Sequence, residues 1–293
     1  MKKIALINDI SGVGRCSLGI ALPVLATMGF TGCPLPTAVL SSHTGFPHAV
    51  VTDLSDRLAD CFSSWQQNDF HFDAVLSGYL GSAAAAEAIL QWIAAEKEAA
   101  AVRGAAEPLF FLDPVMADHG KLYQGMGEAH VDAFRKLLSE ADYAFPNLTE
   151  ACLIADFDYE GLKEALDSCE TDSGRLFVLQ SLCAELGSLS RASIVITGIE
   201  AGDMLMNCVA EPGRLPVFLR NPRAGAGRAG TGDLFAAITA GRILQGQSLT
   251  EAAASAADFI EAAVRHSEAE DISPMMGVQF EDMLERLRVE KLA

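Results

Sequence analysis

Short apolar runs alternate along the chain with longer segments in which apolar residues recur every three or four positions. The short runs predict buried strands, and the longer segments predict helices with one apolar face. Two further extended runs, near residue 210, follow one another and predict an antiparallel pair. The strands are expected at residues 3–7, 33–40, 74–76, 109–112, 143–145, 193–196, 203–209 and 215–220, and the helices at 16–28, 54–66, 83–101, 130–138, 149–155, 176–186, 234–244, 249–266 and 280–289.

This order of elements indicates an α/β fold. Strands that alternate with helices form a central, mostly parallel sheet with helices on both faces, which is a three-layer α/β/α arrangement. No linker, repeat or shift of composition divides the sequence, so we expect a single domain over residues 1–293. Half of the residues are hydrophobic and a fifth are charged, which supplies a full core and excludes a disordered chain.

Net charge and hydropathy limit the possible partners. The 39 acidic residues outnumber the 21 Lys and Arg residues and leave a formal charge of −18. We therefore expect no nucleic-acid and no membrane partner, since anionic phosphate surfaces attract basic patches. The first apolar run is too short for a signal peptide, and the seven cysteines show no paired spacing, so we expect a cytoplasmic protein with reduced cysteines.

In sheets of this class, ligands bind at the carboxyl ends of the strands. The polar residues that follow the predicted strands are therefore the candidates for a functional site. They are Asn8, Asp9, Ser11, residues 41–44, residues 77–79, Asp113, Asp118, Asn147, Glu150, Thr197 and the segment before residue 234.

The segment 223–233 is rich in glycine and comes directly before a predicted helix. Glycines at 225, 227, 230 and 232 let backbone N–H groups converge near the positive end of the helix dipole, which predicts an anion site. Residues 225–230 also fit G-x-G-x-x-G, but another helix follows instead of a strand, so a dinucleotide site is not favoured. Asp233 is expected in the first helical turn, either as a residue that stabilises the helix end or as a general base.

Two pairs of polar residues at strand ends could serve a metal ion. Asp113 and Asp118 lie on one loop, where they form either an ordinary polar loop or a Mg²⁺ site, since Mg²⁺ takes one or two carboxylates plus phosphate oxygens. Asn147 and Glu150 begin a helix, and Glu150 is either a helix-start carboxylate or a holder of metal-bound water. The six histidines show no zinc spacing.

Taken together, these segments resemble the pyridoxal kinase branch of the ribokinase superfamily. The Gly-x-Gly-Asp turn is the mark of the superfamily, and the resemblance runs in order along almost the whole chain. The matching pieces are Ser11 after the first strand, Ser-Ser-His-Thr-Gly-Phe at 41–46, Leu-Ser-Gly-Tyr-Leu-Gly at 76–81, Asp-Pro-Val-Met-Ala-Asp at 113–118, Pro-Asn-Leu-Thr-Glu at 146–150, Val-Ile-Thr-Gly at 195–198 and Gly-Thr-Gly-Asp at 230–233.

The resemblance implies a ribokinase-like fold and an enzyme that phosphorylates the 5′-hydroxymethyl group of pyridoxal, pyridoxamine or pyridoxine with ATP and Mg²⁺. It implies Asp233 as the base, with Gly230, Thr231 and Gly232 supplying the anion hole. Ser11, Thr44 and Tyr79 would bind the aromatic alcohol together with Asp233, and the enzyme would be a homodimer. The implied ATP residues are Asp113, Tyr123, Asn147, Glu150, Thr197, Gly198, Thr231 and Gly232, and the implied metal residues are Asp113, Asp118 and Glu150.

Three features depart from that family pattern or point elsewhere. The segment around Ser11 is shorter and richer in glycine than the usual version, and Phe145 stands where some relatives have a threonine associated with a monovalent cation. The sequence therefore does not indicate whether a monovalent cation is used. The opening Asp-Ile-Ser-Gly-Val-Gly at 9–14 also resembles the hydroxymethylpyrimidine kinases, which are the alternative. A non-catalytic pseudokinase is disfavoured because the Gly-x-Gly-Asp turn and the carboxylates are intact.

Overall fold

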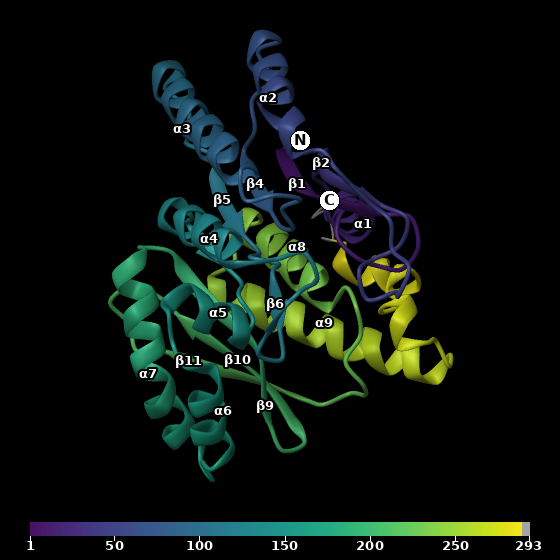
Figure 1. The fold of residues 1–293 in the computed structure, drawn as a ribbon, viewed down its shortest axis with the longest axis vertical. Helices are drawn as coiled ribbons and strands as arrows, with labels where there is room; N and C mark the ends of the chain where they lie inside the picture. The colour runs from purple at the N-terminus through teal and green to yellow at the C-terminus, as the bar shows by residue number, and fades with distance from the viewer. Residues whose placement is uncertain (289–293) are drawn as a thin grey trace, which may run out of the picture.

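The computed structural model describes residues 1–288, which build a nine-stranded sheet in the order β11-β10-β9-β8-β5-β4-β1-β2-β3 (Figure 1). The strands from β9 to β2 in this order are parallel, and the outer strands β3, β10 and β11 run antiparallel to their neighbours. The strands are β1 (Lys3–Ser11), β2 (Thr31–Leu40), β3 (Val51–Asp53), β4 (Ala74–Ser77), β5 (Leu109–Leu112), β8 (Tyr143–Ala144), β9 (Ser193–Ala201), β10 (Met204–Ala210) and β11 (Val217–Pro222), and a separate hairpin joins β6 (Ala117–Asp118) to β7 (Lys121–Leu122).

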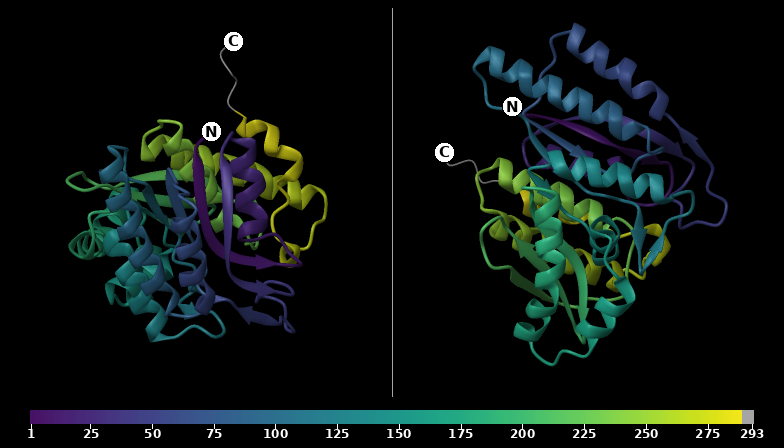
Figure 2. Two further views of the ribbon diagram at one scale, coloured as in Figure 1. Left: turned by 90° about the horizontal axis from the view of Figure 1, so that it is seen from above. Right: turned by 60° about the vertical axis from the view of Figure 1, so that its left-hand side comes forward.

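Helices cover both faces of the sheet (Figures 1 and 2). Alternate residues of β1 divide between the two cores: Ala5 and Ile7 pack with α2 to α7, whereas Ile4 and Leu6 pack with α1, α8 and α9. A strand buried on both faces has to be apolar throughout, which explains the continuous apolar run at residues 3–7. The helices are α1 (Leu18–Thr27), α2 (Leu58–Gln67), α3 (Ala85–Arg103), α4 (Glu128–Glu140), α5 (Leu148–Ala155), α6 (Tyr159–Asp167), α7 (Asp172–Leu189), α8 (Thr231–Leu244) and α9 (Leu249–Ala269).

The predicted three-layer α/β/α fold with a mostly parallel sheet is confirmed, and the differences lie in short or weakly patterned elements. Helix α6 buries only Leu162 and Leu166, which is too little apolar periodicity for a prediction. Helix α7 begins at Asp172 instead of residue 176, because the Thr171 side chain caps it by accepting the N–H of Gly174. The helix predicted at 280–289 is wrong in type: residues Glu281–Leu287 form a 3₁₀ helix, and residue 289 lies outside the described residues.

Strand β1 is the point at which the order of the sheet changes direction. The chain passes from β1 to β2 on one side, and β4, β5, β8 and β9 are then added on the other side. The crevice beyond the carboxyl ends of β1 and β4 is therefore the expected ligand site. Among residues 1–288, no helix has both the length and the apolar character that a membrane crossing requires.

Candidate active site

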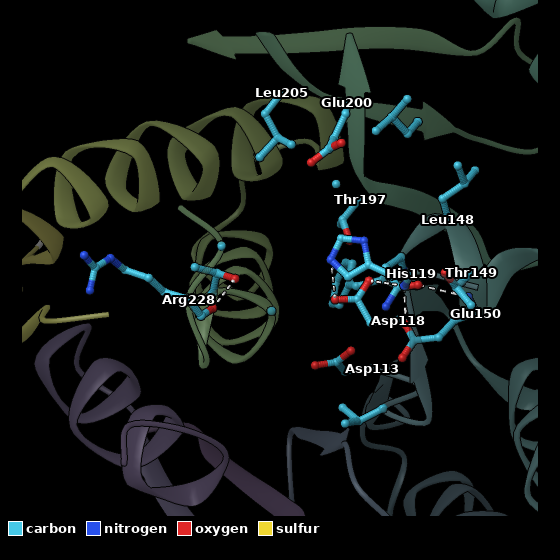
Figure 3. A pocket seen from close by; sticks show the side chains of 18 of the residues that line it. Asp113, Asp118, His119, Leu148, Thr149, Glu150, Thr197, Glu200, Leu205 and Arg228 are labelled. Carbon is cyan, nitrogen blue, oxygen red and sulfur yellow. Dashed lines mark hydrogen bonds and ion pairs between the residues drawn. The ribbon is translucent and has the colours of Figure 1, made fainter. Parts of the chain in front are cut away.

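A cavity of about 530 Å³ opens at the carboxyl edge of the sheet, between the start of α8 and the loops that follow β5, β8 and β9 (Figure 3). Every residue that the sequence assigned to ATP, metal binding or phosphate transfer lines this cavity. These residues are Asp113, Asp118, Tyr123, Asn147, Glu150, Thr197, Gly198, Gly230, Thr231, Gly232 and Asp233.

The predicted substrate residues Ser11, Thr44 and Tyr79 do not line this cavity. Ser11 and Tyr79 lie at the ends of β1 and β4, beside the Asp233 end of the site. The Ser11 hydroxyl donates to Asp9 Oδ2 at 3.1 Å, and the Tyr79 N–H donates to Asn8 Oδ1 at 2.8 Å. Thr44 lies in the loop 41–50, and its side chain makes no hydrogen bond to any of residues 1–288. The structure therefore brings Ser11 and Tyr79 near Asp233 but does not bring Thr44 into contact with it.

Glu150 holds the start of α5 to the loop after β5. Its carboxylate is 3% exposed and accepts backbone N–H groups from Met116 at 3.0 Å and from Asn147 at 2.9 Å. Asn147 completes a capping box by accepting the Glu150 N–H at 3.0 Å, and its side-chain nitrogen donates to the Ala117 carbonyl at 2.7 Å. Burial raises the pKa of Glu150 to about 8 in spite of these hydrogen bonds. Glu150 is thus a helix-start carboxylate, and its contact with metal-bound water stays a prediction.

Asp113 follows β5 and lies near Glu150, but its surroundings differ. The side chain is buried, and its carboxylate accepts no hydrogen bond from any of residues 1–288. Burial raises the pKa of Asp113 well above its usual value, and the charges of Glu150 and Asp233 raise it further. A buried carboxylate without a donor is stabilised by a cation, so Asp113 is suited to bind one.

The balance of charge in the cavity supports a cation site. The basic side chain of Arg228 already donates to the Ile272 carbonyl at 2.6 Å and to Glu268 at 2.8 Å, and it points away from the carboxylates (Figure 3). A polyphosphate would therefore meet mainly negative charge here unless a divalent cation accompanied it. Against Lys163 and Arg228, the lining carries the carboxylates of Asp113, Asp118, Glu150, Asp167, Glu200 and Asp233.

The donor set fits Mg²⁺ rather than a metal held by protein alone. Within residues 1–288, no three His, Cys, Asp or Glu side chains are arranged to hold an ion by themselves. Mg²⁺ does not need such a set, because it usually binds one or two carboxylates and completes its shell with water and substrate phosphates. Phe145 packs between Phe111 and Phe235, so its side chain gives no oxygen to a monovalent cation.

Asp118 lies on the β6–β7 hairpin, whose two turn residues His119 and Gly120 both have positive φ angles. Such a two-residue turn is typical of tight hairpins. The Gly120 N–H donates to the Thr149 hydroxyl at 2.9 Å, which fastens the turn to α5. Asp118 Oδ1 accepts the His119 N–H at 2.8 Å, and its side chain remains half exposed toward the cavity (Figure 3).

The predicted anion site forms at the start of α8. Gly230 has a φ of +84°, and a Cβ atom there would lie 2.3 Å from the Arg15 carbonyl oxygen, so only glycine fits. The first backbone bond of the helix runs from the Leu234 N–H to the Gly230 carbonyl at 3.0 Å. The N–H groups of residues 231–233 precede this bond and have no carbonyl partner within the helix. The Asp233 N–H donates to its own carboxylate, so the N–H groups of Thr231 and Gly232 remain for an anion.

Asp233 is the third residue of α8, as expected, and its carboxyl group lies between the cavity and the end of β1. Asn8 Nδ2 donates to Asp233 Oδ1 at 3.4 Å. The pKa of Asp233 is raised to about 7, mainly by burial and to a smaller extent by the charge of Asp9, although the backbone N–H of Ser17 and the amide of Asn8 lower it. A carboxyl group with a pKa near neutrality is suited to accept a proton.

A second cavity of about 190 Å³ adjoins the first and was not predicted from the sequence. The residues that line both cavities are Thr197, Gly198, Glu200, Leu205, Gly227, Arg228, Thr231 and Gly232. The residues of the second cavity come from β9, β10, β11, the glycine-rich segment, α8 and α9. The sequence singled out the glycine-rich segment, Thr197 and Gly198, but it did not predict that an apolar cavity forms beside them. The apolar side chains are Leu205, Phe235, Ala257, Ile260 and Val264.

Sequence reasoning also missed Lys163, which lines the larger cavity from α6. Its ammonium group pairs with Asp167 one helical turn further on, at 2.9 Å. The pairing at i,i+4 was readable in the sequence, but the helix that carries it was not predicted. Asn8 was a candidate as a polar residue after a strand, without an assigned role.

Known proteins match the chain over almost its full length. The sequence model of the phosphomethylpyrimidine kinase family matches residues 21–275. A crystal structure of a putative phosphomethylpyrimidine kinase from Bacteroides thetaiotaomicron is 31% identical, with a TM-score of 0.86 over 98% of this chain and 93% of that one. A second crystal form, which contains pyridoxal, is 30% identical over 98% of this chain and 95% of that one, with a TM-score of 0.83.

Proteins named as pyridoxal kinases match equally well. The pyridoxal kinase from Lactobacillus plantarum is 30% identical, with a TM-score of 0.83 over 98% of this chain and 96% of that one. A pyridoxal kinase of Paraburkholderia phymatum is 28% identical over 90% of this chain and 88% of its own length. The chain belongs to the phosphomethylpyrimidine kinase family and has the ribokinase-like fold of the pyridoxal kinases.

Proposed function

We propose that the chain transfers the γ-phosphate of ATP to the 5′-hydroxymethyl group of pyridoxal, pyridoxamine or pyridoxine. The observation that carries this proposal is the position of Asp233. Its carboxyl group, with a pKa of about 7, lies at the start of α8 beside N–H groups that have no partner within the helix. A base and an anion site side by side are what transfer of a phosphoryl group to an alcohol requires.

In this proposal, Asp233 accepts the proton of the hydroxymethyl group while its oxygen attacks the γ-phosphorus. The N–H groups of Thr231 and Gly232 stabilise the negative charge on the transferred group, and Gly230 sets the direction of the turn. Asp113 would hold Mg²⁺, and Glu150 would keep the loop of Asp113 in place through its backbone hydrogen bonds. Bound Mg²⁺ would offset the charge of the phosphates and of the surrounding carboxylates.

The two cavities suit the two ends of ATP. We assign the triphosphate to the larger cavity, where the carboxylates and the start of α8 lie, and the nucleobase to the smaller one. The smaller cavity offers apolar side chains such as Leu205 and Ile260 to a flat base. Thr197 and Gly198 border both cavities and would lie beside the ribose. Tyr123 and Asp118 would approach the phosphates from the β6–β7 hairpin.

The aromatic alcohol would bind on the β1 side of Asp233. Ser11 and Tyr79 lie there, at the ends of β1 and β4, and a Tyr79 ring can cover a flat pyridine. Thr44 would join them only if the loop 41–50 closes over the ring. The Bacteroides thetaiotaomicron relative was crystallised with pyridoxal, which supports a pyridine alcohol as the acceptor.

Hydroxymethylpyrimidine is the second candidate acceptor, because the matching family model is that of the phosphomethylpyrimidine kinases. Purified protein should be assayed for ATP consumption with pyridoxal, pyridoxamine, pyridoxine and hydroxymethylpyrimidine side by side. We expect turnover with at least one of the three pyridines to exceed turnover with the pyrimidine. A preference for hydroxymethylpyrimidine would replace the pyridoxal assignment, and no turnover with any acceptor would contradict a kinase.

We also propose that the chain works as a cytoplasmic homodimer of single kinase domains. The support is a row of exposed apolar side chains near the edge of the sheet, at which Ile10 pairs with Val39 and the adjacent β3 contributes Val51. These side chains are 39%, 45% and 45% exposed, respectively. Exposed apolar patches of this kind mark protein interfaces. Light scattering during size-exclusion chromatography tests this, and a monomer at all concentrations would contradict it.

A further inference from the structure

Asn8 lies in β1, where the order of the strands changes direction, and its side-chain amide has a fixed orientation. The residue is 9% exposed, and its Oδ1 accepts backbone N–H groups from Asp9 at 2.9 Å and from Tyr79 at 2.8 Å. These two bonds fill the acceptor capacity of the amide oxygen. A reversed amide would set its NH₂ group against two N–H donors. The NH₂ group must therefore point away from them, and it lies 3.4 Å from Asp233 Oδ1.

The backbone directly after β4 leaves space for this amide only because residue 78 is glycine. A Cβ atom on Gly78 would lie 2.5 Å from Asn8 Nδ2 and 2.7 Å from Asn8 Oδ1. Gly78 does not have a positive φ angle, so its backbone conformation is open to any residue. The glycine is therefore needed for the room that the Asn8 amide occupies.

The surroundings of Asp233 make a neutral donor important. The acidic groups whose charges act with that of Asp233 are Asp9 from β1 and Asp113 from the loop after β5. Cys16 before α1 and Tyr123 after β7 also face Asp233, but their raised pKa values keep them neutral. None of these is a cation, so the carboxylate is repelled from more than one side. A fixed amide donor can hold such a carboxylate in one orientation without neutralising it.

We propose that Asn8 is a positioning residue for the transfer reaction: its amide, held by the N–H groups of Asp9 and Tyr79 and seated against Gly78, orients the Asp233 carboxylate toward the acceptor hydroxyl. This inference rests on the proposed function of Asp233 as the base. Asn8 also connects the proposed phosphate site with the proposed acceptor site. Its amide oxygen accepts the N–H of Tyr79, which is proposed to cover the acceptor ring.

The test combines two variants that remove the Asn8 NH₂ donor with one variant at Gly78 that fills the space of the amide. Asn8→Ala removes the amide, Asn8→Asp keeps the acceptor oxygen and removes the NH₂ donor, and Gly78→Ala displaces an unchanged amide. We expect each to lower kcat at least about tenfold, since a misplacement of about 1 Å can cost about 10²-fold. The KM for ATP should stay within about twofold, because Asn8 does not line the nucleotide cavities. Asn68→Ala, at an exposed asparagine, is the matched control.

A double-mutant cycle gives the decisive comparison. In the Asn8→Ala background there is no amide to displace, so Gly78→Ala should lower kcat no further. Full additivity of the two losses, or a kcat within about threefold of wild type in both Asn8 variants, would overturn the inference. If Asn8→Ala does not fold, Asn8→Asp and Gly78→Ala carry the same test.

Crystal structures separate this inference from the proposed function. If the wild-type protein phosphorylates no acceptor, the proposed function fails, and the orientation of Asp233 is then compared between wild type and Asn8→Asp. A carboxyl group that turns away in the variant supports the positioning role. A carboxyl group that stays in place in the variant overturns it.

Discussion

Asp113 and Glu150 lie at one edge of the sheet, yet only the carboxylate of Glu150 is hydrogen-bonded within residues 1–288. Both oxygens of Glu150 accept backbone N–H groups, whereas the Asp113 carboxylate accepts no hydrogen bond from residues 1–288. Glu150 is thereby committed to holding the loop after β5 against α5. Asp113 is the carboxylate that remains available for a ligand of opposite charge.

Asp113→Asn should stabilise the ligand-free protein while impairing its reaction. The raised pKa means that folded Asp113 keeps its proton to a higher pH than unfolded Asp113, which titrates near pH 4. As pH rises above about 4, the unfolded state therefore binds fewer protons, and folding stability falls. At pH 8 the variant should melt higher than wild type, by about 2–4 °C for each kcal/mol of relief. Calorimetry from pH 5 to pH 8 measures this.

The difference in melting temperature between wild type and Asp113→Asn should shrink toward pH 5. Asp118→Asn is the matched control, since its half-exposed side chain should alter the melting temperature little. Parallel melting profiles for wild type and Asp113→Asn would show that the buried charge of Asp113 costs no stability.

Asp233→Asn should abolish most turnover without affecting binding. The amide keeps the shape of the side chain but cannot accept the hydroxyl proton, so we expect kcat to fall at least about 100-fold. The KM values for ATP and for the acceptor should change little, and the melting temperature should not fall. Steady-state kinetics measures this, and a kcat within a few-fold of wild type would make Asp233 a residue of the helix end alone.

The pH profile should follow the ionisation of the same carboxyl group. A base must be deprotonated to act, and Asp233 has a pKa of about 7, so kcat/KM for the acceptor should rise through about pH 6 to 8. The midpoint of the rise should equal the pKa of Asp233 in the enzyme before the acceptor binds, because kcat/KM reports the ionisation of that form. The residual activity of Asp233→Asn should lack this rise, and a rise that persists in the variant would assign it to another group.

Gly230→Ala should damage both folding and activity, because its Cβ atom would meet the Arg15 carbonyl and its φ angle is +84°. Strain of this kind costs roughly 1–3 kcal/mol, and relieving it would move the N–H groups at the start of α8. Gly227→Ala is the control: a Cβ atom there meets nothing within 4 Å. Equal melting temperatures and equal kcat for both variants would contradict this account of the turn.

Asp118→Ala should raise the KM for Mg²⁺–ATP. Its free energy of unfolding should stay within about 0.5 kcal/mol of wild type. The reason is that the half-exposed carboxylate faces the cavity and is bonded to its own hairpin alone. Titration of Mg²⁺ at fixed ATP measures the effect. If wild type and variant respond identically to Mg²⁺, Asp118 is a solvated loop residue.

The sequence predicted best those parts of the site that depend on neighbours along the chain. Asp113 after a strand, Glu150 three residues after Asn147, and Asp233 after Gly230 are local patterns, and all of them line the cavity. The orientation of Asn8 was not predictable, because its partner Tyr79 is 71 residues away and meets it only through the pairing of β1 with β4. The same holds for Arg228, whose partner Glu268 lies on α9.

The fold was predictable where a strand is buried on both faces and its sequence is therefore a continuous apolar run, as in β1. It was not predictable where few side chains are buried: α6 buries Leu162 and Leu166, and β3 is exposed throughout. Helix α7 shows a third cause, since its first turn is fixed by the Thr171 cap before any buried residue appears.

The change of direction in the strand order at β1 separates the two sides of the proposed active site. The residues proposed to bind the acceptor come from β1, β4 and the loop before β3, whereas those proposed to bind ATP come from later segments, after β5, β8 and β9 and at α8. Loops on the first side can therefore be replaced during evolution while the apparatus for handling ATP stays intact. A change of acceptor alcohol then requires changes in the loops of the first side alone, while Asn8 and Asp233 keep the two sides in contact.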